Sequence, residues 1–322
     1  MLFGNRAWAL IISYYSNPAD KRFSLQFMPA QGGRTEIIMK LPFELDLGGK
    51  TIVITGGGGV LCGMFAKALG QCGANVAILD LNLNAARAVA DEINKVGGHA
   101  KGYEANVLSK ESLSAACGKI TSDFGSCDIL INGAGGNNPR GTTTKEYLEY
   151  DDLKNNGELT TFFDLDPSGV EFVFNLNFLG TLLTTQVFAK SMAENKKGTI
   201  INISSMNAFT PLTKIPAYSG AKAAVSNFTE WLAVHFSKVG IRVNAIAPGF
   251  FVTNQNRALL FDDDGNPTAR TKKILAATPM ERFGEPEELI GTLLWLINDA
   301  ASGFVNGVVV PVDGGFSAYS GV

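Results

Sequence analysis

Histidine and cysteine are scarce in this sequence. The 322 residues include two histidines, His99 and His235, which are far apart and lack the spacing of metal ligands. Four cysteines are present without a Cys-x-x-Cys pair, so we interpret them as reduced, packed thiols. The composition therefore predicts neither a metal site nor a disulfide framework.

Charged residues are also few, at 18% of the chain, and hydrophobic residues make up 46%. The net charge is −3, and no dense run of lysine and arginine occurs. A protein that follows a phosphate backbone needs such a basic patch, so nucleic acid is not an expected partner. The apolar content is instead that of a chain with a large core.

The first residues form a short apolar run, Ala7 to Tyr15, preceded by Arg6. The Ser-Asn-Pro-Ala-Asp that follows is a poor cleavage site for a signal peptide. We therefore expect residues 1–44 to be an N-terminal extension outside the fold, and a true start at Met39 is possible.

From residue 50 onward, short β-branched runs alternate with helical patterns. The runs are apolar on both faces, as in strands that are covered by helices on both sides. We predict a single α/β domain over residues 45–322, with a doubly wound, Rossmann-type parallel sheet and helices on both faces. The expected strands are 51–55, 75–80, 99–104, 128–131, 199–203, 241–246 and 308–310.

Two expected helices have unusual compositions. Residues 172–189 contain no charged residue, but Asn175, Asn177, Gln186 and several threonines argue against a membrane span. Residues 217–236 are similarly apolar, with Lys222 and Glu230 as their charged residues. Helices that are apolar nearly all round are buried, so we predict a homo-oligomer with helices packed across a two-fold axis.

Two segments interrupt the alternation, 136–169 and 253–285. Both follow predicted strands, so both should lie at the carboxyl edge of the sheet, where α/β proteins bind ligands. We expect them to be substrate-binding loops, the second with a short helix.

A glycine-rich turn, Thr55 to Gly63, joins the first strand of the domain to the first helix. Glycines allow the backbone to approach a pyrophosphate, which the helix N-terminus also attracts. Asp80 ends the second strand, where a carboxylate can bind the ribose hydroxyls of NAD and repel the 2′-phosphate of NADP. The alternative role of Asp80 is that of a helix cap, but together with the glycine turn it favours NAD as the cofactor.

Tyr218 and Lys222 are four residues apart in an expected helix and thus share one face. We expect the lysine ammonium to lower the pKa of the tyrosine, which would make Tyr218 a general acid/base near neutral pH. Ser205 follows the strand 199–203, and its hydroxyl could hold the substrate oxygen.

At this point the sequence resembles the short-chain dehydrogenase/reductase family over about residues 45–322. The motifs that carry the resemblance are the glycine turn, Asn132-Gly-Ala-Gly135, Asn177, Ser205, Tyr218, Lys222, Pro248-Gly249 with Thr253, and Asp313-Gly-Gly315. The resemblance implies an NAD-dependent oxidoreductase, usually tetrameric, with Asn177, Ser205, Tyr218 and Lys222 as catalytic residues. It also implies that the cofactor contacts Gly56, Gly58, Gly59, Leu61, Asp80, Asn106, Val107, Asn132, Ala134, Gly135, Tyr218, Lys222, Pro248, Gly249, Val252 and Thr253.

The sequence departs from the family pattern at three positions. Val60 and Cys62 stand where the glycine turn usually has its middle and last glycines, which puts close helix–strand packing at Cys62 in doubt. Asn106 replaces the aspartate that usually faces the adenine.

Several loop sequences, including Asn137-Asn-Pro139 and Pro248 to Arg257, resemble the D-mannonate oxidoreductase (fructuronate reductase) branch. That resemblance implies interconversion of D-mannonate and D-fructuronate in the cytoplasm. A sugar acid needs a cation for its carboxylate, for which arginine is well suited. The candidates are Arg257 first, then Lys214 and Arg140, with Asn207, Asn254 and Gln255 for hydroxyl groups.

Two alternatives stay open. The same chemistry could act on another polyol or sugar acid, such as gluconate or a deoxygluconate. A non-catalytic dinucleotide-binding sensor is the alternative from another class, although a sensor has no need for an acid/base tyrosine.

Overall fold

The computed structural model describes residues 8–11, 26–29, 45–154, 157–252, 257–262 and 264–321. The chain divides into two compact units, Met1–Ile38 and Met39–Val322. In the first unit, strands β1 (Trp8–Ile11) and β2 (Gln26–Pro29) pair in the antiparallel sense. The sequence analysis did not predict this pair of strands.

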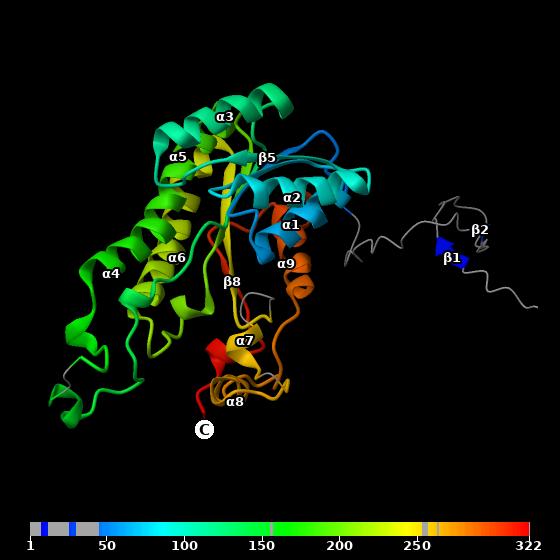
Figure 1. The fold of residues 1–322 in the computed structure, drawn as a ribbon. Helices are drawn as coiled ribbons and strands as arrows, with labels where there is room; N and C mark the ends of the chain where they lie inside the picture. The colour runs from blue at the N-terminus through cyan, green and yellow to red at the C-terminus, as the bar shows by residue number, and fades with distance from the viewer. Residues whose placement is uncertain are drawn as a thin grey trace, which may run out of the picture. The chain divides into compact units, whose positions relative to one another are not determined.

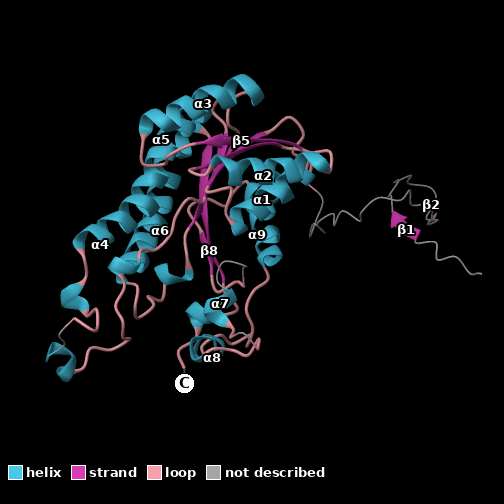
Figure 2. Cartoon of the chain, in the orientation of Figure 1, coloured by secondary structure: helices cyan, strands magenta, loops and turns pink. Residues whose placement is uncertain are grey.

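The second unit is built on a seven-stranded sheet in the order β5-β4-β3-β6-β7-β8-β9. Figures 1 and 2 show strands β5 and β8 of this sheet among the helices that cover it. Each neighbouring pair in this sheet is parallel. The strand order reverses between β3 and β6, and this switch point is where doubly wound folds bind ligands. The predicted fold class is confirmed. The strands are β3 (Thr51–Thr55), β4 (Asn75–Asp80), β5 (His99–Glu104), β6 (Ile129–Asn132), β7 (Gly198–Ile203), β8 (Ile241–Pro248) and β9 (Val309–Val312).

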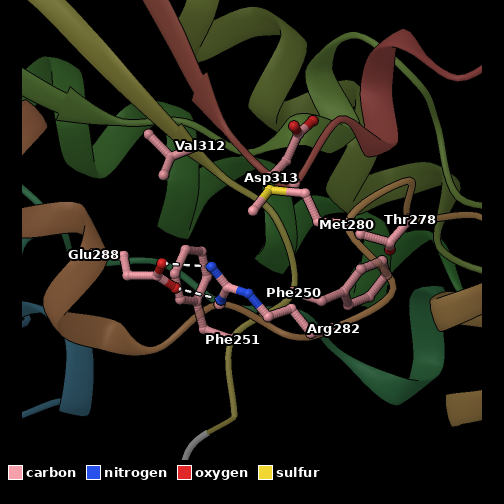
Figure 3. Close-up of a pocket in the computed structure, with 10 residues that line it drawn as sticks. Phe250, Phe251, Thr278, Met280, Arg282, Glu288, Val312 and Asp313 are labelled. Atoms are coloured by element: carbon pink, nitrogen blue, oxygen red, sulfur yellow. Dashed lines mark hydrogen bonds and ion pairs between the residues drawn. The ribbon is translucent and has the colours of Figure 1, made fainter.

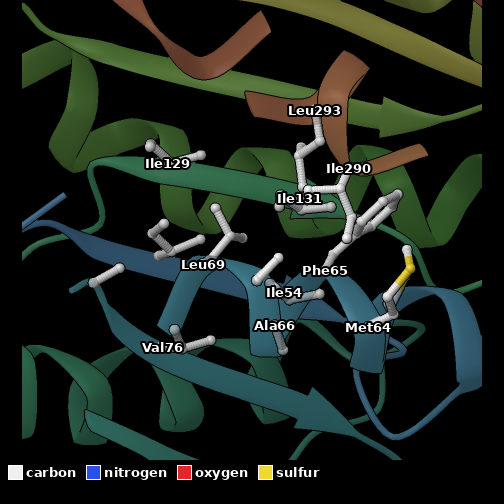
Figure 4. Packing of buried hydrophobic residues seen from close by; sticks show 14 of the residues in the cluster. Ile54, Met64, Phe65, Ala66, Leu69, Val76, Ile129, Ile131, Ile290 and Leu293 are labelled. Atoms are coloured by element: carbon white, nitrogen blue, oxygen red, sulfur yellow. The ribbon is translucent and has the colours of Figure 1, made fainter. Parts of the chain in front are cut away.

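Helices cover both faces of the sheet, because alternate side chains of a strand point to opposite sides. Ile52 and Ile54 of β3 belong to a core shared with α1 (Val60–Gln71), α2 (Leu83–Lys95) and α9 (Ile290–Ile297) (Figure 4). Val53 belongs to a second core shared with α3 (Lys110–Phe124), α5 (Gly180–Glu194) and α6 (Pro216–Phe236). All five residues of β3 are buried, as expected for a central strand of such a sheet.

The expected apolar helix is longer than predicted and contains a π-helical turn. It comprises α4 (Pro167–Phe174), the π-turn η4 (Asn175–Leu179) and α5. By length and composition alone, Pro167–Glu194 could cross a membrane. Its residues Phe188 and Met192 are instead buried in the second core, and Thr181 and Thr185 donate hydrogen bonds to the carbonyls four residues earlier. These are the contacts of a core helix.

The two predicted loops carry short helices of their own. Segment 136–169 contains three 3₁₀ turns, and segment 253–285 contains two helices where one was expected. These and the other short helices are η1 (Pro139–Gly141), η2 (Tyr150–Lys154), η3 (Phe162–Asp164), η5 (Met206–Ala208), η6 (Ser237–Val239), α7 (Arg257–Leu260), α8 (Ala269–Ala276), η7 (Pro286–Leu289), α10 (Asp299–Ser302) and η8 (Phe316–Ala318).

Candidate active site

Tyr218 and Lys222 lie in the first turns of α6, next to the end of β7. The Lys222 side chain is buried, and its Nζ donates a hydrogen bond of 2.8 Å to the carbonyl oxygen of Ile203, the last residue of β7. The same Nζ lies 5.6 Å from the centre of the Tyr218 ring. The predicted i, i+4 pair is therefore present, held to the sheet by the lysine.

The electrostatics of this pair differ from the prediction. Burial raises the pKa of Tyr218 to about 12, and a hydrogen bond with the Ser205 hydroxyl opposes that rise. Burial lowers the pKa of Lys222 to about 8. The expectation that Lys222 lowers the Tyr218 pKa was wrong for the described residues, because removal from water is the dominant effect on both groups.

Asn177 lies in the π-turn η4, a feature that is common at functional sites. Its Nδ2 donates hydrogen bonds of 2.8 Å to the carbonyls of Gly136 and Val173, and its Oδ1 accepts one of 3.2 Å from the Gly136 amide. Asn177 thus joins the interrupted helix to the loop after β6.

Gly135 lies between the side chains of Asn177 and Lys222. A Cβ atom at this position would lie 2.5 Å from Asn177 Oδ1 and 3.2 Å from Lys222 Nζ. Only a residue without a side chain fits between the amide and the ammonium. Gly135 also lines a cavity at the carboxyl edge of β3 and β6, so Asn177 and Lys222 lie directly behind its wall, whereas none of the four predicted catalytic residues is itself a lining residue.

This cavity has a volume of about 540 Å³ and lies at the strand-order switch point. Several predicted cofactor residues line it: Gly56, Gly59, Leu61, Asp80, Ala134, Gly135 and Gly249. Gly58, Val107, Tyr218, Lys222, Pro248 and Val252 are not among its lining residues, and Thr253 lies outside the described residues. Its walls also include Phe250, Phe251, Leu260 and Arg270, which the sequence analysis did not single out.

The glycine turn has the geometry of a dinucleotide cradle. Gly56 has a φ of +65°, and a Cβ there would lie 2.9 Å from the Cα of Ala134. The Gly58 amide donates a hydrogen bond of 3.0 Å to Asp80 Oδ2, and the Asn82 amide donates one of 2.9 Å to Oδ1. The N-terminus of α1 carries no side-chain cap and no acidic residue in its first turn. Its amides are therefore suited to a phosphate, and Asp80 retains acceptor capacity for ribose hydroxyls.

Cys62 shows how the departure from the glycine pattern is accommodated. Its side chain is buried, and a Cβ on Gly133 would collide with the Cys62 Sγ. The thiol therefore packs directly against the backbone after β6, and helix α1 keeps its close approach to the sheet. Burial raises the pKa of the thiol to about 12, so it is neutral.

Asn132 and Asn106 are not among the residues that line the cavity. The Asn132 Nδ2 donates to Thr185 Oγ1 (3.0 Å) and Asn202 Oδ1 (2.8 Å) in the interior, so its side chain supports the strands and does not line the cavity. The exposed Asn106 uses its Oδ1 to accept a hydrogen bond from the Leu108 amide, in the turn before α3. The hydrogen bonds of both amides within the protein thus fix their side chains locally, and their predicted contacts with a cofactor stay predictions.

The predicted substrate cations are dispersed. Arg140 forms an ion pair of 3.1 Å with Asp166, and Lys214 is exposed. The Arg257 guanidinium lies over the Phe261 ring, 5.4 Å from its centre. Asn207 is buried beside Ser205, and its Oδ1 has no hydrogen-bond partner among the described residues. Asn254 and Gln255 lie outside the described residues.

A second cavity of about 90 Å³ lies between the ends of β8 and β9 and the segment 278–288 (Figure 3). Arg282 and Glu288 close one side through two hydrogen bonds of 2.7 Å, which help to hold the pKa of Glu288 near 2. The ring of Phe251 fills the space beside Gly284. The backbones of these two residues also pair in a β-bridge. This cluster fixes the loop that follows α8 to the end of the sheet.

Comparisons with known proteins agree with this geometry. Residues 50–263 match the short chain dehydrogenase family. The chain is 64% identical over 287 residues to an uncharacterized oxidoreductase of Haemophilus influenzae, covering 89% of this chain and 100% of the relative. It is 32% identical over 270 residues to the 5-keto-D-gluconate 5-reductase of Escherichia coli K12, covering 84% and 96%.

A crystal structure of a protein from Haemophilus influenzae, provisionally named a D-mannonate oxidoreductase and solved with bound NAD, superposes with a TM-score of 0.83. Its sequence is 65% identical, and the superposition covers 86% of this chain and 98% of that chain. The chain therefore belongs to the short-chain dehydrogenase family of oxidoreductases.

Proposed function

We propose that residues 45–322 form an NAD(H)-dependent oxidoreductase that interconverts a sugar acid and its keto form, with D-mannonate and D-fructuronate as the pair. The observation that carries the proposal is the position of Gly135. This residue lines the large cavity and lies beside Asn177 and Lys222, so two of the four proposed catalytic groups lie next to the space that suits a dinucleotide.

The residues of the cavity fit NAD. The glycine turn leaves room for a diphosphate at the N-terminus of α1, and the Asp80 carboxylate offers acceptors to ribose hydroxyls but repels a 2′-phosphate. When bound, NAD supplies the hydride acceptor for oxidation, and NADH the hydride donor for reduction.

The protein's own residues handle the proton and the orientation of the substrate. Tyr218, protonated at neutral pH, donates its phenolic proton to the substrate oxygen during reduction and accepts it during oxidation. Ser205, which hydrogen-bonds Tyr218, holds the same oxygen in place. Lys222, positively charged below pH 8, uses one N–H donor on the Ile203 carbonyl and retains the others for the cofactor ribose, and Asn177 holds a water that returns the proton to solvent.

The substrate carboxylate requires a cation, and we propose Arg257. It is exposed at the start of α7, and its guanidinium is held by the Phe261 ring and by no ion pair among the described residues. Arg257→Ala should raise the Michaelis constant for the sugar acid about tenfold, as expected for the loss of a charge-assisted pair. An unchanged constant would refute this role and favour Lys214 or Arg140.

The relative from Escherichia coli named 5-keto-D-gluconate 5-reductase supports a second candidate substrate class, the keto-gluconates. Purified protein should be assayed by NADH absorbance with D-fructuronate, 5-keto-D-gluconate and a neutral ketose, and in parallel with NADPH. Fast NADH-dependent turnover of D-fructuronate supports the proposal. Faster turnover of 5-keto-D-gluconate would instead assign the keto-gluconates as the substrate class. NADH binding without turnover of any substrate would favour a non-catalytic dinucleotide-binding sensor.

We also propose a cytoplasmic homotetramer. The helices expected at the interface expose apolar side chains: Phe172 and Phe174 on α4, and Trp231 and Val234 on α6. Burial of these surfaces against a second copy would remove them from water. Light scattering should give four times the monomer mass of 34.2 kDa, and a monomer would refute this assembly.

A further inference from the structure

Helix α8 places a cation on the wall of the cofactor cavity. Arg270, its second residue, lines that cavity together with Gly59, Val60 and Leu61 at the N-terminus of α1. These residues are more than 200 positions apart in sequence. The guanidinium and the α1 amides therefore border the same space.

Arg270 has no ion pair among the residues that the structure describes, and it is exposed. Two other cations of the segment are paired, Lys273 with Glu146 at 2.8 Å and Arg282 with Glu288 at 2.7 Å, whereas Lys272 also has no ion pair among the described residues but does not line the cavity. Arg270 also stands in the first turn of α8, where a cation faces the positive end of the helix dipole. The position does not benefit the helix, which indicates that this charge acts on a partner outside it.

The other residues that line the cavity indicate that the partner of Arg270 is an anion. The N-terminus of α1 attracts negative charge, and no acidic residue occupies its first turn. Asp80 is the only carboxylate among the lining residues, and two backbone amides already donate to it. A group with two adjacent phosphates would meet amides on one side and the forked guanidinium on the other.

We propose that Arg270 binds the diphosphate of the cofactor; this inference rests on the proposed dinucleotide function. The Lys273–Glu146 pair connects the same helix to the segment 136–169. The helix that carries Arg270 is thus also tied to the segment that we expect to bind substrate.

The test measures binding without turnover. Displacement of NADH, followed by its fluorescence, gives affinities of the full-length protein for ADP-ribose, which has the diphosphate, and for adenosine, which lacks it. Arg270→Ala should weaken ADP-ribose binding roughly tenfold and leave adenosine binding unchanged. Arg270→Lys should restore part of the loss, and the effect should shrink in high salt.

The matched control is Lys272→Ala, which removes one exposed cation from the same helix at a position that does not line the cavity. It should bind ADP-ribose like the unmodified protein. Unchanged ADP-ribose binding by Arg270→Ala would overturn the inference while leaving the proposed function intact. A loss confined to NADPH would also overturn it, because Arg270 would then recognise a 2′-phosphate. If the unmodified protein binds neither NADH nor ADP-ribose, the proposed function itself fails.

Discussion

Lys222 should reduce the stability of the fold at neutral pH while serving the site. Burial lowers its pKa from 10.5 to about 8, so the unfolded chain holds more protons than the native protein between these values. Stability therefore rises with pH across this window. Because of this shift in the Lys222 pKa, the free energy of unfolding should rise by about 2 to 3 kcal/mol between pH 7 and pH 10.

The variant Lys222→Met keeps the length of the side chain and removes the charge. At pH 7 the relief of charge burial, roughly 3 kcal/mol, exceeds the loss of the hydrogen bond to Ile203, about 1 to 2 kcal/mol. The variant should thus be slightly more stable than the unmodified protein at pH 7. The unmodified protein should gain 2 to 3 kcal/mol relative to the variant by pH 10, as estimated from about 1.4 kcal/mol per pKa unit.

Urea unfolding followed by tryptophan fluorescence at pH 7, 8.5 and 10 measures this difference. Protomer concentration is kept fixed, because assembly contributes to apparent stability. Lys190→Met, which removes an exposed lysine from α5, controls for the loss of one positive charge. A stability difference between the Lys222 variant and the unmodified protein that stays constant from pH 7 to pH 10 would refute the argument.

Three further changes test the site. Tyr218→Phe removes the proton donor and should lower kcat by 10²- to 10⁴-fold without weakening NADH binding; a kcat within threefold of normal, measured by NADH absorbance, would exclude the acid/base role. Gly133→Ala places a methyl group against the Cys62 Sγ and should cost about 1 to 3 kcal/mol in urea unfolding, with partial rescue by Cys62→Ala; no rescue would mean that the contact does not set the spacing. Asp80→Ser should weaken NADH binding and improve NADPH binding in fluorescence titrations, because a carboxylate that repels the 2′-phosphate is lost; an unchanged ratio of the two affinities would place the selectivity elsewhere.

Most of the fold could be predicted because its information is local. The strands of the large sheet are short β-branched or apolar runs between turn signals, and the alternation with helices allows few topologies. The π-turn at Asn177 could not be predicted, because residues 172–189 are uncharged and apolar nearly all round, so a shift of the helical pattern by one residue leaves no visible mark. The two strands in residues 1–38 lie in a segment without regular polar alternation.

The candidate site was predictable to the extent that its geometry follows from spacing within one element. Tyr218 and Lys222 share a face because they are four residues apart in α6, and the glycine turn shows its role through its place between β3 and α1. The pKa values did not follow from this spacing. They depend on how much protein surrounds each group, which is set by elements distant in sequence.

The position of Arg270 on the cavity wall could likewise not be predicted from the sequence. Its sequence context, a polar segment with two following lysines, is that of an ordinary solvated helix. Its place on the cavity wall depends on how the chain after β8 returns to the N-terminus of α1, and on the contact between Phe251 and Gly284 that fixes this return. A residue that reaches the cavity only through the tertiary structure cannot be recognised from residue spacing in the sequence. The lack of an ion pair at Arg270 among the described residues becomes informative only once the charges around the cavity are known.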